Sequence, residues 1–296
     1  MFIDSFIGFL RVERNYSQHT QRAYAKDICA FRDFLAGIDG SLSFFNADHD
    51  LVRAWVASLM DAGLASSSVC RKLSSLRTFY DYLLREGYVS WNPASAVQGP
   101  KRRKYLPVFV KESDMDLLLD EQVGGDGYEA CRDRMILMLF YETGIRLSEL
   151  VGLDLLSVDM SASVIKVLGK RGRERIVPFA DGLKRELECY LDVRGVFSQL
   201  SSGALFLSSK GSRVSRSFVY RMVNRSLGSV GMAKKRSPHV LRHSFATAML
   251  NNGAEIGVVK ELLGHKRLAT TEIYTHLTFE ELKKVYGKAH PRAGIN

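Results

Sequence analysis

Apolar residues recur every three or four positions through the first 90 residues, the spacing that places them on one side of a helix. This pattern predicts four helices joined by short turns, over residues 2–14, from about residue 17, over about 48–61 and over about 66–86. The core-facing side of the fourth helix is Val69, Leu73, Leu76, Tyr80 and Leu83. The first part of the chain is therefore expected to be a small helical domain, residues 1–95.

The remainder of the chain mixes helical periodicity with two short β-branched runs. Residues 164–168 and 175–178 favour strands, and residues 169–173 form a glycine-flanked turn between them. Helices are expected over residues 112–122, 128–141, 182–194, 215–230 and 256–263, with further helices starting at Leu147 and Ser237. The fold class is therefore mainly α (α+β), with one small antiparallel sheet in a second domain, residues 108–296.

Between these domains, residues 96–107 are expected to form an exposed linker. The linker contains four consecutive basic residues, Lys101, Arg102, Arg103 and Lys104. Such a run could follow the phosphates of a DNA duplex and release counterions, or it could be a solubilising charge run. The sequence leaves both interpretations open.

The charge and composition of the chain indicate which partners and which cellular compartment to expect. The 296 residues include 42 Lys and Arg against 32 Asp and Glu, a formal net charge of +10 that favours a polyanionic partner. The four cysteines have no CxxC or metal-ligand spacing and are expected to be reduced, as in a cytoplasmic protein. The apolar run at residues 135–141 is too short to span a membrane, and no signal peptide is expected.

Polar residues on two helices of the first domain form candidate DNA-binding faces. The second helix places His19, Arg22 and Lys26 in a stripe roughly opposite its apolar side. The fourth helix carries an arginine and three short hydroxyl side chains away from its core side: Arg71, Ser74, Ser75 and Thr78. Short side chains would allow close approach of a phosphate backbone, although a solvated surface would explain the same pattern.

A stretch near the C-terminus contains candidate chemistry. Ser237 and Pro238 form a helix-start signature, and His239 and Arg242 then share a face in the first turn, where free backbone N–H groups favour an anion. Two more candidates follow the helical pattern of residues 256–263: His265, directly after a glycine, and Tyr274. Each residue alone has an ordinary structural interpretation, and only the set points to a site that could hold a phosphate and attack it.

Two other stretches supply the parts that this one lacks. TGIRLSEL, residues 143–150, presents Arg146 and Glu149 three positions apart, and LGKRGRER, residues 168–175, places Lys170 on the glycine-flanked turn. The same turn carries two further candidate DNA contacts, Arg171 and Arg173.

In chain order, these residues resemble the catalytic boxes of tyrosine site-specific recombinases: Arg146 with Glu149, Lys170, His239 with Arg242, His265, and Tyr274. The resemblance covers nearly the whole chain and continues past the tyrosine. The tail YTHLTFEELKKVYGKAHPRA looks like that of the Xer chromosome-dimer recombinases, and its VYGKAHPRA segment looks closer to the XerC branch than to XerD.

The residue types suit attack on a phosphodiester, which needs charge neutralisation, a nucleophile and a proton for the leaving oxygen. The planar forks of Arg146 and Arg242 would bind the non-bridging oxygens, a geometry that lysine cannot match. His239 and His265 would add hydrogen bonds and move protons.

The remaining chemistry is assigned to three side chains. Tyr274 is the expected nucleophile, and its covalent phosphotyrosine would conserve bond energy for religation. Lys170 is the candidate general acid for the departing oxygen. Glu149 is expected to orient Arg146 or His239 without taking part in the chemistry.

The resemblance implies more than the residues specify. It implies a 3′-phosphotyrosyl link, a freed 5′-hydroxyl, and four protomers, two active at a time, that exchange strands through a Holliday junction. For the Xer type it implies resolution of chromosome dimers at cell division. The implied partners are double-stranded DNA with a specific recombination site, a homo- or hetero-tetramer with a second Xer-type recombinase, and a cell-division DNA translocase. No cofactor is expected: two arginines take the place of metal ions, and the sequence has no P-loop.

Other functions stay open at this point. A phage or mobile-element integrase or invertase would share the family motifs, and a type IB topoisomerase would share the phosphotyrosine chemistry without a defined site. A non-catalytic DNA-binding protein is the alternative from another class. The chemically competent residues at all the catalytic positions argue against it.

The tail also has an amphipathic pattern. From Thr278 onward, Phe279, Leu282, Val285 and Tyr286 form one stripe of a predicted helix, which needs an apolar surface to stay ordered. The helix could fold back on its own domain or enter a groove on a neighbouring protomer. The Xer resemblance favours exchange between protomers.

Overall fold

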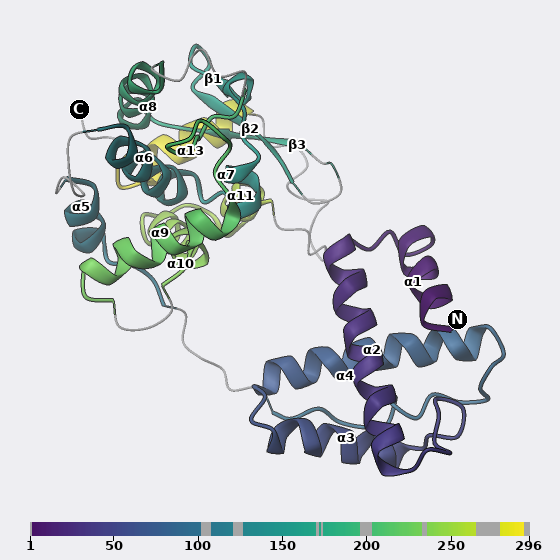
Figure 1. Ribbon diagram of the computed structural model, residues 1–296. Helices are drawn as coiled ribbons and strands as arrows, with labels where there is room; N and C mark the ends of the chain where they lie inside the picture. The colour runs from purple at the N-terminus through teal and green to yellow at the C-terminus, as the bar shows by residue number, and fades with distance from the viewer. Residues whose placement is uncertain are drawn as a thin grey trace. The chain divides into compact units, whose positions relative to one another are not determined.

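The computed structural model describes residues 2–101, 108–120, 127–169, 172, 174–195, 203–232, 236–264 and 279–292. The chain forms two compact units, residues 1–105 and residues 106–296 (Figure 1). The division falls inside the segment 96–107 that the sequence assigns to a linker. Val97, near the start of that segment, is buried in the core of the first unit.

The first unit consists of the four expected helices: α1 (Phe2–Val12), α2 (Gln18–Ile38), α3 (His49–Asp61) and α4 (Ser66–Arg85). Side-chain caps mark the starts of α2 and α3. The Ser17 side chain accepts from the Thr20 backbone N–H at 3.3 Å, and the Asp48 side chain accepts from the Leu51 backbone N–H at 2.8 Å. The predicted apolar side of α4 is buried from Val69 to Leu83 against aromatic residues of the other helices.

One charged group lies within this core. Asp27 of α2 is only 1% exposed and binds three side chains of α4. Arg71 donates to both of its carboxyl oxygens, Lys72 donates at 3.1 Å, and the Ser75 hydroxyl donates at 2.8 Å. Hydrogen bonds of this kind offset the cost of burying a carboxylate. The prediction that Ser75 contacts DNA is wrong, since this residue is fully buried and its hydroxyl binds Asp27.

Removing the Ser75 hydroxyl should therefore affect stability. We expect Ser75→Ala to lower the free energy of unfolding of the first unit by about 1–2 kcal/mol, because the buried Asp27 loses a donor. Urea unfolding followed by tryptophan fluorescence would measure this change, since both tryptophans, Trp55 and Trp91, lie in this unit. The exposed neighbour provides the control: Ser74→Ala should change stability by less than about 0.5 kcal/mol. Equal effects of the two substitutions would contradict the assignment.

The second unit is mainly helical and contains a small sheet. Its helices are α5 (Glu112–Asp120), α6 (Tyr128–Thr143), α7 (Leu147–Val151), the 3-10 turn η1 (Leu155–Ser157), α8 (Asp181–Arg194), α9 (Arg216–Ser229), α10 (Pro238–Asn251), α11 (Ile256–Leu263) and α13 (Phe279–Ala289). The strands are β1 (Val158–Asp159), β2 (Val164–Leu168) and β3 (Glu174–Pro178), antiparallel in the order β1-β2-β3. The predicted fold class is confirmed. The sequence missed β1 because two residues are too few to show an alternating pattern.

Helix α6 forms the centre of this unit. Residues 135–143 are all buried, and the helix packs between α8 and α10 (Figure 1). The apolar run noted in the sequence is thus the core of a globular unit. In the part of the chain that the structure describes, no helix combines the length and the apolar character needed to cross a membrane.

Helix α13 packs against α10, α11 and β3 of its own unit. Tyr286 and Ala289 are buried in a cluster with Phe245, Met249 and Leu262. This is the fold-back arrangement, one of the two that the sequence allows for the tail. The structure contains one chain, and exchange of the tail between protomers stays a prediction.

Two buried titratable groups lie in the region where α6 meets the C-terminal segment. Glu142 is fully buried, its carboxyl oxygens have no hydrogen bond among the described residues, and Arg292 Nε lies 4.0 Å away. Burial raises the pKa of Glu142 to about 8, with Arg292 opposing the shift. Burial lowers the pKa of His290, which stacks on Tyr286, to about 4. Both groups are therefore mostly neutral at pH 7.

These shifts predict how stability depends on pH. Between pH 4.5 and 8 folded Glu142 keeps a proton that the unfolded chain releases, so its contribution to stability falls as pH rises. The contribution of His290 to stability rises with pH between pH 4 and 6.5, opposite to that of Glu142. The effect of Glu142 should therefore be measured between pH 6.5 and 8.

We expect the wild type to lose about 1 kcal/mol of stability for each pH unit in this window and Glu142→Gln to lose much less. Urea unfolding followed by far-UV circular dichroism would measure this, with tryptophan fluorescence of the first unit as internal control. If the stability of Glu142→Gln falls with pH as steeply as that of the wild type, the fall is caused by another titratable group.

Candidate functional site

The turn between α6 and α7 positions two of the predicted residues. Gly144 ends α6 in the left-handed region at φ +59°, and a Cβ there would lie 2.5 Å from Phe245 Cδ1 of α10. The turn can therefore pack closely on α10. Arg146 is the N-cap of helix α7, and its backbone N–H donates to Glu149 Oε2 at 2.8 Å.

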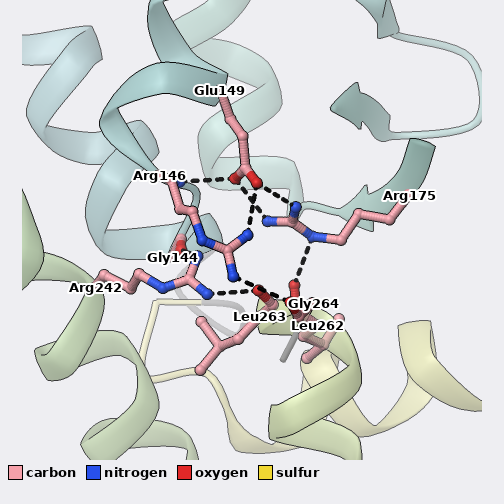
Figure 2. A network of polar contacts seen from close by, with 8 residues as sticks. All are labelled: Gly144, Arg146, Glu149, Arg175, Arg242, Leu262, Leu263 and Gly264. Atoms are coloured by element: carbon pink, nitrogen blue, oxygen red, sulfur yellow. Dashed lines mark hydrogen bonds and ion pairs between the residues drawn. The ribbon is translucent and has the colours of Figure 1, made fainter. Parts of the chain in front are cut away.

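The Glu149 carboxylate is 1% exposed and binds two arginines (Figure 2). Arg146 Nη1 donates to Oε1 at 2.7 Å, while Arg175 of β3 donates to both oxygens, at 2.7 and 2.9 Å. Burial alone would raise the pKa of Glu149, but the bonds from Arg175 and Arg146 outweigh it and hold the pKa below its ordinary value. Glu149 thus binds Arg146, the first of its two expected partners.

The C-terminus of α11 meets the same cluster (Figure 2). Three arginines each donate to one of three successive carbonyls: Arg175 to Leu262 at 3.1 Å, Arg242 to Leu263, and Arg146 to Gly264 at 3.0 Å. Free carbonyls at a helix C-terminus carry partial negative charge and favour cations. Gly264 caps this helix in the left-handed region, at φ +63°.

Arg242 is the most buried arginine of the three, with 7% of the residue exposed. Its second bond, to the Gly144 carbonyl, fixes it on the turn before Arg146. Burial, followed by repulsion from Arg146, lowers the pKa of Arg242 to about 10, so it stays charged at neutral pH. Helix α10 starts as predicted, with Ser237 as N-cap and Pro238 at the first position.

The cluster retains an opening toward solvent. The Arg146 side chain is 33% exposed, and His239 is exposed in the first turn of α10. Three guanidinium groups against one carboxylate leave an excess of positive charge. The arrangement can therefore bind an anion with forked donors. Within the described ranges, no three His, Cys, Asp or Glu side chains gather to hold a metal ion.

The structure brings together Arg146, Glu149 and Arg242. Eight predicted residues lie outside the described residues: Lys170, Arg171, Arg173, His265, Tyr274, Arg102, Arg103 and Lys104. In the chain, Lys170 falls between the end of β2 and the start of β3, and His265 follows the cap of α11 directly.

Sequence reasoning missed Arg175, which it treated as an ordinary strand residue. A signal was present: Arg175 alternates with Val177, so it shares the inward face of β3 and pairs across the sheet with Val167. An arginine on the inward face of a strand needs a buried acceptor. Glu149 and the end of α11 supply that acceptor.

Most candidate DNA-binding residues of the first unit lie on adjacent helices, α2 and α4. His19, Arg22 and Lys26 are exposed along α2, and Ser74 is exposed on α4. The Arg71 side chain is 48% exposed and bound to Asp27. Thr78 is half-buried, and its hydroxyl donates to the Ser74 carbonyl. Lys101, which follows α4 in the chain, is exposed. This face remains a candidate for DNA contact.

Comparison with known proteins adds independent evidence. Residues 109–281 match the model of the phage integrase family, and residues 3–87 match that of the phage integrase N-terminal SAM-like domain. The tyrosine recombinase XerC of Pelobacter propionicus is 40% identical over 292 residues, covering 98% of this chain and 95% of that protein. The XerC of Pelotomaculum thermopropionicum is 39% identical over 301 residues and covers 98% of each.

Solved structures agree in fold. The XerH site-specific recombinase bound to palindromic difH superposes with a TM-score of 0.73 at 22% identity, covering 93% of this chain and 81% of that one. A lambda integrase tetramer bound to a Holliday junction gives a TM-score of 0.71 at 18% identity, covering 91% and 77%. The chain therefore belongs to the phage integrase family, as a tyrosine recombinase, an enzyme that cleaves and rejoins DNA.

Proposed function

We propose that this recombinase acts at a specific DNA site, forms a 3′-phosphotyrosine at Tyr274 and resolves chromosome dimers at cell division through a Holliday junction. The observation that carries the proposal is the arginine cluster around Glu149, next to the end of α11. The identity of about 40% to XerC proteins over nearly the full chain favours dimer resolution over integration of a mobile element.

The cluster supports activation of a phosphodiester. Arg146 and Arg242 would neutralise the non-bridging oxygens, and their bonds to Glu149, Gly144 and α11 hold them in place before DNA arrives. Donors that are already oriented need little rearrangement when charge develops in the transition state. Positive charge thus comes from side chains, and neither a metal ion nor ATP enters the proposal.

The remaining predicted residues would attack the phosphorus and transfer the protons. The Tyr274 oxygen would form a bond to phosphorus while the bond from phosphorus to the 5′ oxygen breaks. The tyrosine proton would pass to His239 or His265, and Lys170 would supply a proton to the 5′ oxygen. Arg171 and Arg173, beside Lys170 in the chain, would contact the DNA backbone.

DNA binding would involve both units. The exposed residues of α2 and α4, together with Lys101 and the basic run after it, would neutralise phosphates on one side of the duplex. Arg71 would do so from a fixed position, because Asp27 holds it.

The proposed assembly is a tetramer on two recombination sites, homomeric or shared with a second Xer-type recombinase. A cell-division DNA translocase is a candidate regulator. The lambda integrase tetramer on a Holliday junction, which shares this fold, supports this stoichiometry. Helix α13 would dock on a neighbouring protomer, using the same apolar residues that it buries within its own unit.

The first test uses a nicked, site-bearing DNA that traps the covalent intermediate. We expect the wild type to form a tyrosine-linked adduct and Tyr274→Phe to form none, while duplex affinity changes by less than about twofold, since phosphate contacts elsewhere supply binding. Denaturing gels and gel shifts would measure the two quantities. An adduct in the Phe variant would assign the nucleophile to another residue, and relaxation of supercoiled DNA without a defined site would indicate a topoisomerase.

A second test concerns Lys170 as general acid. Lys170→Ala should cleave ordinary DNA slowly, because the 5′ oxygen must leave without a proton. Sulphur at that bridging position gives a leaving group whose thiol pKa is about 8.5, so it scarcely needs protonation. This substrate should restore most of the rate of the variant in single-turnover cleavage. Failure to restore it would move the acid role to His239 or to water.

A further inference from the structure

Arg175 takes part in the cluster but has no part in the chemistry proposed above. Its two Nη atoms donate to the two oxygens of Glu149, at 2.7 and 2.9 Å, and its Nε donates to the Leu262 carbonyl at 3.1 Å. All three nitrogens of the guanidinium therefore have acceptors within the protein. The side chain is 15% exposed, about half the exposure of Arg146.

Arg175 joins three elements that lie next to predicted catalytic residues in the chain. It lies on β3, directly after the turn that contains Lys170 in the chain. Through Glu149 it reaches α7, whose N-cap is Arg146. Through Leu262 it reaches the end of α11, which precedes His265.

Close packing supports this connection. A Cβ on Gly264 would lie 3.2 Å from Cδ of Arg175 and 3.4 Å from its Nε. The glycine cap of α11 thus leaves room for the arginine side chain to lie against it.

We propose that Arg175 is a positioning residue: it holds Glu149 and the C-terminus of α11 at a fixed separation, and through Glu149 it orients Arg146. The inference rests on the proposed function, because it concerns the same reaction. Glu149 Oε1 accepts from both Arg146 and Arg175. Without Arg175, this buried carboxylate would bind Arg146 alone, and Arg146 would be drawn away from the phosphate.

Two substitutions test this role. Arg175→Lys keeps the charge that Glu149 needs for folding, but one ammonium group cannot reproduce a bidentate fork and a bond to Leu262 together. Arg175→Gln removes the charge. The matched control is Arg134→Lys, because Arg134 also forms an ion pair between two elements of this unit, with Glu186 of α8 at 2.7 Å, outside the cluster.

The readouts are the single-turnover rate of adduct formation on the nicked DNA, duplex affinity by gel shift, and thermal unfolding. We expect Arg175→Lys to slow adduct formation by about 10- to 100-fold, as small misplacements of reacting groups do. Affinity should stay within about threefold, because most phosphate contacts lie elsewhere. Arg134→Lys should leave the rate unchanged.

Two further measurements separate positioning from general weakening of the fold. The rate losses of Arg175→Gln and Glu149→Gln should be non-additive, so that the double variant is no slower than the slower single one. A bridging sulphur should fail to rescue Arg175→Lys, since the defect lies in phosphate orientation and not in protonation of the leaving group.

The outcomes are distinct. If the wild type forms no adduct, the proposed function fails. If it does and Arg175→Lys cleaves at the normal rate, only the positioning role is wrong. Additive losses, or a fall in rate matched by equal falls in affinity and thermal stability, would also overturn the role. Rescue by sulphur would show that Arg175 acts through Lys170 instead.

Discussion

The buried carboxylate of Glu149 is the charge on which the site of the second unit depends. Three guanidinium groups lie around it, and their mutual repulsion already contributes to lowering the pKa of Arg242. A single negative charge, bonded directly to Arg146 and Arg175, lets these cations remain close together. The excess positive charge is what a phosphate would neutralise. The cluster is thus held together by contacts within the protein and keeps an excess of positive charge.

The backbone supplies the remaining acceptors. Successive carbonyls at the end of α11 and the carbonyl of Gly144 receive guanidinium N–H groups from all three arginines. Both acceptor segments end in left-handed glycines, Gly144 and Gly264, that pack against neighbouring side chains. Close packing of these two turns therefore fixes the distance between α7, α10 and α11.

The first unit contains a smaller arrangement of the same kind, in which a buried carboxylate binds cationic side chains. Asp27, buried on α2, binds Arg71 and Lys72 of α4 and so holds two cationic side chains in place. In both units a buried carboxylate restrains an arginine that remains partly exposed. Such a restraint would lower the entropy lost if that arginine bound a phosphate.

The sequence alone determined the helices, two of the three strands and the family, because apolar periodicity and short motifs such as Arg146 with Glu149 and His239 with Arg242 are local properties of the chain. It could not show that Ser75 faces inward, since adjacent positions of a helix, such as Ser74 and Ser75, can face the surface and the core respectively. Nor did it identify Arg175, whose partners lie 26 and 87 positions away in the chain. Only tertiary structure brings β3, α7 and the end of α11 together, because long-range packing decides which buried charges meet.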